Sequence, residues 1–190
     1  MALTATLYHW QVALSDVDRG VYESLDLRLA RHPSESLRYL LTRTLAYCLC
    51  YEDGIGFSKG GLSSTDEPPV AVSDPTGRLL FWIDVGAPSA ERLHKATKAA
   101  PRVALFTGAD LLALRREARS RPIHRVEQIE LWRLESRFLD DLEAAIENSG
   151  RRTAQLECMR TDGQLYLTLG GQTLTCALAS TLLSSVLEAS

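Results

Sequence analysis

The chain has 190 residues, of which 45% are hydrophobic and 24% are charged, and its formal net charge is -3. This composition excludes an intrinsically disordered chain and a strongly basic nucleic-acid coat protein, although a local basic cleft stays compatible with it. The length predicts one domain that covers residues 1–190.

The first part of the chain predicts a β-hairpin followed by a helix. Residues 3–14 are rich in Thr, Val and aromatic side chains, and residues 21–29 alternate apolar and polar side chains. Residues 33–52 have apolar side chains at helical spacing, with Pro33 near the predicted first turn. Gly54 and Gly56 end this helix, and residues 60–69 form the most loop-like stretch.

The middle of the chain predicts an α/β arrangement. Strands are expected at 70–72, 79–85, 102–106 and 126–134, and helices at 89–100, 110–119 and 136–148. The strand at 79–85 is almost uniformly apolar, as a strand covered on both faces would be. A strand, a helix and a second strand in succession favour a parallel pair, so the central sheet is predicted to be mixed.

The last third predicts strands at 155–159, 164–169 and 174–179, separated by good hairpin turns. Residues 180–190 fit either a short helix or a loose tail. The predicted fold class is therefore α/β, with a mixed central sheet flanked by helices. An added β portion is expected from the N-terminal hairpin and the C-terminal strands.

The four cysteines and the lack of long apolar runs predict a cytoplasmic protein. Cys48 and Cys50 lack the spacing that metal and redox sites favour, so buried reduced thiols are expected at these positions and at Cys158 and Cys176. No stretch of about 18 apolar residues is present, and the N-terminus lacks the pattern of a signal peptide. We therefore expect no membrane partner.

Carboxylates and a lysine are the residues most indicative of chemistry. Glu35 is predicted in the first turn of a helix, Asp66 and Glu67 in a loop, and Asp84 at the end of the apolar strand. Each has an ordinary alternative, such as helix capping for Glu35 or a surface ion pair with Glu91 for Lys95. Asp84 is the strongest candidate, since an ionised carboxylate ending a buried strand needs a cation or hydrogen bonds.

The order of these residues resembles the PD-(D/E)xK nuclease pattern, in which carboxylates hold Mg²⁺ and a lysine acts on the attacking water. Phosphodiester hydrolysis needs hard oxygen ligands for the metal and a cation near the developing charge. One departure is serious: Gly86 stands where the pattern has its lysine. The lysine would therefore come from the following helix, as Lys95, or be missing.

The whole chain is also similar to the YaeQ family. The resemblance rests on five short segments in order, namely residues 1–6, 30–35, 66–68, 82–86 and 104–107. It implies a compact bacterial protein with a restriction-endonuclease-like variant of the nuclease fold. The family implies no settled activity.

From these observations we predict a Mg²⁺-dependent nuclease-like protein that acts on nucleic-acid phosphodiesters. In this hypothesis Asp66 (or Glu67) and Asp84 bind the metal, Glu35 supports the metal or its water, and Lys95 stabilises the developing charge. Arg31 and Arg43 would contact phosphate. A dense basic run would either contact phosphate or form a solvated helix end followed by a loop, and it consists of Arg115, Arg116, Arg119, Arg121, His124 and Arg125.

The alternative hypothesis is a non-catalytic module that keeps the nuclease-like fold and binds a protein or nucleic-acid partner. Gly86 favours this alternative. Catalysis requires Lys95 close to the carboxylates, whereas a binding module leaves it free to pair with Glu91. A serine hydrolase and a nucleotide-cofactor enzyme are not supported, because the G-x-S-x-G, G-x-G-x-x-G and P-loop motifs are missing. Among the histidines only His32 merits a test.

Overall fold

The computed structural model describes residues 5–58 and 67–188, which fall into two compact units. The first unit comprises Met1–Leu41 and Leu134–Leu178, and the second comprises Thr42–Arg133 and Ala179–Ser190. Asp66, one of the predicted metal ligands, lies outside the described residues. The expectation of one domain over residues 1–190 stays a prediction.

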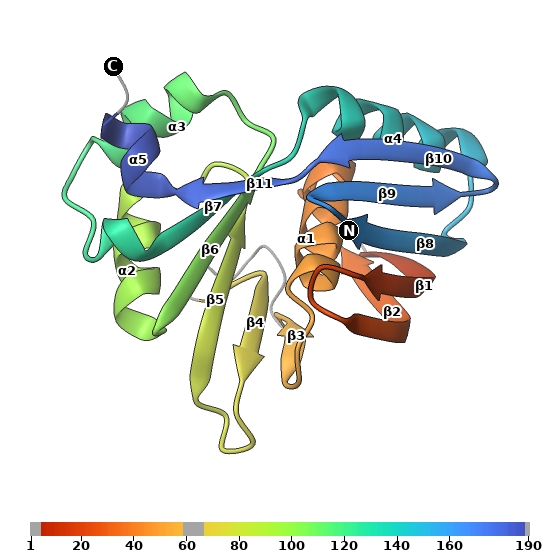
Figure 1. Cartoon of the computed structure of the whole chain (residues 1–190), viewed down its shortest axis with the longest axis horizontal. Coiled ribbons are helices and arrows are strands. Elements are labelled where there is room, and N and C mark those ends of the chain that lie inside the picture. The colour runs from red at the N-terminus through yellow and green to blue at the C-terminus, as the bar shows by residue number, and fades with distance from the viewer. Residues whose placement is uncertain (1–4, 59–66, 189–190) are drawn as a thin grey trace. The chain divides into compact units, whose positions relative to one another are not determined.

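The first unit contains a mixed five-stranded sheet in the order β10-β9-β8-β1-β2 (Figure 1). The N-terminal hairpin joins β8, β9 and β10 through a parallel pairing of β1 with β8, and the other neighbours are antiparallel. This confirms the predicted β portion built from the N-terminal hairpin and the C-terminal strands. The strands are β1 (Thr6–Asp16), β2 (Val21–Arg31), β8 (Thr153–Thr161), β9 (Gln164–Leu169) and β10 (Gln172–Ala177).

Alternation of side chains gives this sheet one buried face. Trp10, Val12 and Leu14 on β1 are buried, whereas the residues between them are exposed. Helix α4 (Ser136–Ser149) contacts β10 and buries an apolar stripe of Phe138, Leu139, Leu142 and Ile146. Gly150 ends α4 in a left-handed conformation, as the sequence predicted.

The second unit contains a mixed six-stranded sheet in the order β11-β7-β6-β5-β4-β3 (Figure 1). Strands β5, β6 and β7 are parallel, which confirms the crossover expected from the strand, helix, strand order. The elements are β3 (Ile55–Phe57), β4 (Val70–Ser73), β5 (Leu79–Val85), α2 (Ala90–Ala99), β6 (Arg102–Thr107), α3 (Leu111–Ala118), β7 (Ile129–Arg133), β11 (Ala179–Leu182) and α5 (Leu183–Glu188).

Helix α2 packs on β5 and β6, and its residues Leu93 and Ala96 share a core with Trp82. The side chain of Ser89 accepts a hydrogen bond from the backbone N–H of Arg92, so Ser89 caps this helix as predicted. The first turn of α2 consequently lies beside the carboxyl end of β5, where Asp84 is located.

Helix α1 (Leu37–Leu49) begins later than the predicted residue 33. The hydroxyl of Ser36 accepts a hydrogen bond from the backbone N–H of Tyr39, so Ser36 acts as the N-cap. Glu35 therefore precedes the helix, and its expected place in the first helical turn was wrong. The boundary between the two units falls inside α1.

Three further segments differ from the sequence prediction. Val126–Gln128 forms a short 3-10 turn (η2) before β7, so the strand predicted at 126–134 starts late. Residues 180–190, expected as a helix or a tail, contribute both strand β11 and helix α5. Strand β3 was not predicted. Its pairing with β4 is antiparallel and involves only three residue pairs.

The four cysteines are buried free thiols, as expected. Within residues 5–58 and 67–188, no helix combines the length and the apolar content that crossing a membrane would need.

Candidate functional site

Asp84, at the carboxyl end of β5, is a buried carboxylate with three hydrogen-bond donors. Its side chain is 2% exposed. The backbone N–H of Val85 donates to Oδ1 at 3.2 Å, and the indole Nε1 of Trp82 donates to Oδ2 at 3.1 Å. Arg92 Nε donates to the same Oδ2 at 2.6 Å. The need for a cation and hydrogen bonds that the sequence indicated is thus met by the protein itself.

Arg92 organises this site, and the sequence analysis did not select it. Its guanidinium lies 5.4 Å from the centre of the Trp82 ring, and Nη2 donates to the main-chain carbonyl of Glu67 at 2.9 Å. Arg92 therefore contacts both Asp84, at the end of β5, and the main chain of Glu67, in the loop before β4. The available signal was a cation in the first turn of a helix that directly follows the strand.

Glu67 is exposed, and its carboxylate Oε2 accepts a hydrogen bond from the hydroxyl of Ser58 at 3.1 Å. The structure thus brings the main chain of Glu67, but not its carboxylate, to the arginine that binds Asp84. The neighbouring Asp66 lies outside the described residues, so its predicted role as a metal ligand stays a prediction.

Lys95 is exposed on α2, which packs on the β5 face that carries Trp82 and Asp84. It follows Arg92 by about one helical turn. Glu91, the alternative partner considered for Lys95, forms an ion pair with Arg121 at 3.3 Å.

Gly86, which directly follows β5, has a backbone conformation that disfavours a side chain. Gly86 has a φ of 84°, in the left-handed region that disfavours residues with a side chain. Its backbone N–H donates to the carbonyl of Phe106 at 2.8 Å, which fixes the chain as it leaves β5. A lysine here would strain the backbone.

Glu35 and Arg31 belong to the first unit, whereas Asp84 and Lys95 belong to the second. Glu35 is 2% exposed, and its Oε2 accepts a hydrogen bond from the backbone N–H of His32 at 3.1 Å. Arg31 Nε donates to the carbonyl of Glu35 at 2.8 Å. These contacts organise the approach to α1. A supporting role for Glu35 near a metal, and a phosphate contact for Arg31, stay predictions.

The predicted phosphate-binding arginines have different environments. Arg43 is 6% exposed, and its guanidinium lies 5.3 Å from the centre of the Phe57 ring. Arg115 Nε donates to the carbonyl of Val186 at 2.7 Å, and Arg119 donates to the carbonyl of Leu187. The two arginines on and beside α3 thus hold the end of α5. Arg116, by contrast, is exposed on α3.

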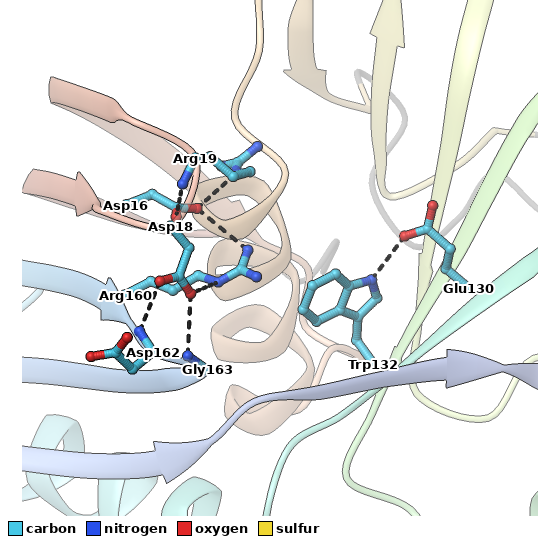
Figure 2. Close-up of polar contacts among 8 residues, drawn as sticks. All are labelled: Asp16, Asp18, Arg19, Glu130, Trp132, Arg160, Asp162 and Gly163. Carbon is cyan, nitrogen blue, oxygen red and sulfur yellow. Dashed lines mark hydrogen bonds and ion pairs between the residues drawn. The ribbon is translucent and has the colours of Figure 1, made fainter.

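Another buried carboxylate in the first unit, Asp16, was not selected by the sequence analysis. Asp16 is 0% exposed, accepts hydrogen bonds from the backbone and side chain of Arg19, and lies 3.5 Å from Arg160. Next to it, Asp18 accepts hydrogen bonds from the backbone N–H groups of Asp162 and Gly163 at 2.7 and 3.2 Å. Figure 2 shows this network joining the β1–β2 turn to the β8–β9 turn.

The donors around Asp18 explain its electrostatics. The hydrogen bond from Gly163, followed by that from Asp162 and the charge of Arg160, holds the pKa of Asp18 below its ordinary value, although desolvation acts in the opposite direction. Both carboxylate oxygens of Asp16 and of Asp18 face protein donors, so we assign these two residues a structural role. Figure 2 also shows a separate contact in the second unit, where Trp132 Nε1 donates to Glu130 at 3.2 Å.

The chain is an α/β protein with two mixed sheets flanked by helices. Its candidate site is a buried aspartate, at the carboxyl end of a parallel strand, that is paired with an arginine. The family model described as "YaeQ protein" matches residues 1–178. The chain therefore belongs to the YaeQ family, as the sequence motifs indicated.

Relatives with the name "Uncharacterized protein YaeQ" occur in bacteria. The Salmonella typhi protein is 31% identical over 172 residues, which cover 88% of this chain and 90% of the relative. The Escherichia coli (strain K12) protein is 37% identical over 107 residues, which cover 56% of this chain. That alignment spans only 59% of the Escherichia coli protein.

Crystal structures of YaeQ proteins have the same fold. The protein from Xanthomonas axonopodis pv. citri superposes with a TM-score of 0.82 at 29% identity, covering 93% of this chain and 98% of the other. The protein from Pseudomonas syringae gives the same TM-score at 28% identity, covering 93% of this chain and 95% of the other. These matches support the α/β class with two mixed sheets.

Proposed function

We propose that this chain is a nucleic-acid-binding module with a restriction-endonuclease-like variant fold, and that it does not hydrolyse its partner. One observation carries the proposal. Both carboxylate oxygens of Asp84 accept hydrogen bonds from protein donors, and one of these donors is the guanidinium of Arg92. Arg92 thus supplies Asp84 with a cation from the protein itself, which supports a role for Asp84 other than metal binding.

The donor set of the described residues does not fit Mg²⁺. This ion requires near-octahedral oxygen coordination and close carboxylate ligands. Across residues 5–58 and 67–188, no group of three or more His, Cys, Asp or Glu residues is arranged to hold a metal ion. Asp84 is already paired with Arg92, and the Glu67 carboxylate is engaged by Ser58.

Nucleic acid is the favoured partner because cations are exposed on the second unit, although the net charge of the chain is negative. Arg116 on α3, Lys98 on α2 and Arg125 before η2 are exposed. Contacts from such cations to phosphates supply most of the sequence-independent affinity of nucleic-acid-binding proteins. A protein partner is the remaining alternative for this module.

A second candidate is Mg²⁺-dependent phosphodiester hydrolysis, favoured by the link that Arg92 makes between Asp84 and the main chain of Glu67. In that candidate Asp84, with Asp66 or Glu67, holds the metal, Glu35 supports the metal or its water, and Lys95 stabilises the developing charge. The metal would have to displace Arg92 from Asp84.

The two candidates separate in one set of titrations. We would titrate Mg²⁺ and Mn²⁺ calorimetrically into the wild type, Asp84→Asn and Arg92→Gln. The same proteins would be incubated with labelled single- and double-stranded DNA and RNA. We expect nucleic acid to bind without metal and to remain intact. One-site metal binding that disappears in Asp84→Asn, together with cleavage, would establish hydrolysis instead. Absence of binding to every nucleic acid would redirect the proposal to a protein partner.

A further inference from the structure

A small basic pocket lies in the second unit, away from Asp84. It has a volume of about 320 Å³ and is formed by the start of β5, the end of α2 and the loop before η2. Four basic side chains line it, namely Arg78, Lys98, His124 and Arg125. None of the lining residues is acidic. A concave surface of one charge sign concentrates ligands of the opposite charge.

Two of these cations are available to a ligand. Among the described residues, the side chains of Lys98 and Arg125 make no hydrogen bond or ion pair. The hydrogen bonds from Thr76 and from the backbone of Arg78 hold the pKa of the neighbouring Asp74 below its ordinary value, and the charge of Arg78 adds to this effect. The ring of His124 lies 6.2 Å from that of His94.

Arg125 also has an unfavourable backbone conformation. Its φ of 49° and ψ of 40° are left-handed, which crowds the side chain of any residue except glycine. Within residues 5–58 and 67–188, the other non-glycine residue with positive φ is Asp162, a residue type that tolerates this region. Strained residues of this kind concentrate at ligand sites. The carbonyl of Arg125 accepts a hydrogen bond from the backbone N–H of Gln128 at 2.9 Å, whereas its guanidinium has no partner within the described residues.

Helix polarity offers an ordinary explanation for only part of the pocket. Lys98 lies in the last turn of α2, where a cation offsets the negative end of the helix. Arg125 lies outside any α-helix, just before η2, so this explanation does not account for its strained conformation.

We propose that this pocket binds a phosphate group, with Arg125 and Lys98 as its principal contacts. Arginine presents paired donors to phosphate oxygens, and lysine supplies a compact point charge. The phosphate can come from a nucleic-acid backbone or from a small phosphorylated compound. Only the nucleic-acid source rests on the proposed function, because the pocket itself does not involve Asp84.

The test uses the full chain and two probes, inorganic pyrophosphate and a fluorescein-labelled single-stranded oligonucleotide. Binding would be measured for the wild type and for Lys98→Gln combined with Arg125→Gln. A charge-matched control would combine Arg28→Gln with Arg137→Gln, since both arginines are exposed in the first unit, on β2 and α4. We expect the pocket variant to lose pyrophosphate binding and the control to retain it.

Salt dependence tests the nucleic-acid source. The slope of log affinity against log salt concentration should fall by roughly 1 for each phosphate-contacting cation removed.

Arg125→Gly supplies a further readout. It should raise the melting temperature, because glycine relieves the left-handed strain, and weaken binding of the probes. If Arg125 served only to stabilise the fold, Arg125→Gly would instead lower the melting temperature.

The outcomes separate this proposal from the proposed function. Binding of pyrophosphate but not of the oligonucleotide would support the pocket with a small phosphorylated ligand, and would contradict the nucleic-acid role. Oligonucleotide cleavage with Mg²⁺ would overturn the non-catalytic function but leave the pocket supported if its variant still lost binding. Equal affinities of the wild type and the pocket variant for both probes, or no binding by the wild type, would overturn the pocket.

Discussion

At the scale of single residues, the stability of the second unit depends on the charge balance at Asp84. A carboxylate that is 2% exposed is tolerated because Arg92 donates to it at 2.6 Å and Trp82 supplies a further hydrogen bond. Such pairs contribute modestly as a whole, whereas removal of one partner leaves an uncompensated buried charge.

Arg92→Met should therefore destabilise the protein by about 3 kcal/mol, because it strands the Asp84 carboxylate. Combining it with Asp84→Asn should restore part of the loss. Urea unfolding of the double-mutant cycle measures both effects. The control is Arg121→Met, whose exposed pair with Glu91 should be worth no more than about 1 kcal/mol. Equal losses for Arg92→Met and Arg121→Met would contradict the argument.

Asp18 predicts a pH dependence at acidic pH. Its folded pKa lies below the ordinary value of 3.8, so the unfolded chain binds the proton more readily. The stabilisation from Asp18 is consequently present above the unfolded pKa and is lost as the pH falls through the folded pKa. At about pH 5 the wild type should have a higher free energy of unfolding than Asp18→Asn, and this difference should shrink as the pH falls to about pH 2. Urea midpoints across this range test it, with Asp141→Asn as an exposed control.

At the scale of elements, the turn that leads into β3 requires a glycine. Gly54 has a φ of 86°, and a Cβ at this position would lie 2.2 Å from the carbonyl oxygen of Ser73. Gly77, in the β4–β5 turn, has nearly the same φ of 85°, but a Cβ added there would meet no atom within 4 Å. Substitutions at Gly54 and Gly77 therefore distinguish the cost of backbone strain from the cost of a steric clash.

Gly77→Ala should cost about 1–2 kcal/mol through left-handed strain alone. Gly54→Ala should cost clearly more, because the main chain of β4 must also move. Thermal unfolding of both variants measures the difference in stability. Equal melting temperatures would show that the backbone near Gly54 and Ser73 moves apart without a cost in stability.

Strong periodic patterns made many elements predictable from the sequence. Strand β5 was predicted with its observed bounds because a run of apolar residues ends at a turn residue, and Ser89 marked the start of α2. Strands β3 and β11 escaped because they are short edge strands without a clear alternation, and tertiary pairing with β4 and β7 forms them.

Tertiary contacts also explain why the sequence indicated only part of the candidate site. Burial at the end of an apolar strand identified Asp84. The cation that meets it, Arg92, is separated from it in sequence and reaches it only because α2 folds back onto β5. Arg125 could not be distinguished within the basic run, since its left-handed backbone has no signature in the sequence.

At the scale of the whole molecule, each unit is assembled from two separate segments of the chain. The last segment, Ala179–Ser190, supplies β11 and α5 to the second unit, and Leu183 is fully buried in its core. This segment extends beyond residues 1–178, the part that the family model matches.

Leu183→Ala should therefore cost about 2–5 kcal/mol, as expected for a truncated core leucine. Thermal unfolding measures the loss. Leu182, its neighbour on β11, is 43% exposed, so Leu182→Ala is the matched control and should change stability little. A small effect at both positions would indicate that α5 adds nothing to the core.

The interleaved segments also bear on the order of events during protein synthesis. Strand β1 leaves the ribosome early, yet its parallel neighbour β8 begins at Thr153, and the edge of the other sheet is closed by β11 at Ala179–Leu182. The sheet of the first unit cannot be completed before Ala177 has been translated, and that of the second unit not before Leu182. Until then, unpaired strand edges stay exposed, as in other folds dominated by distant pairings. The nascent chain should accordingly depend on chaperones more than a protein of similar size whose units are continuous in sequence.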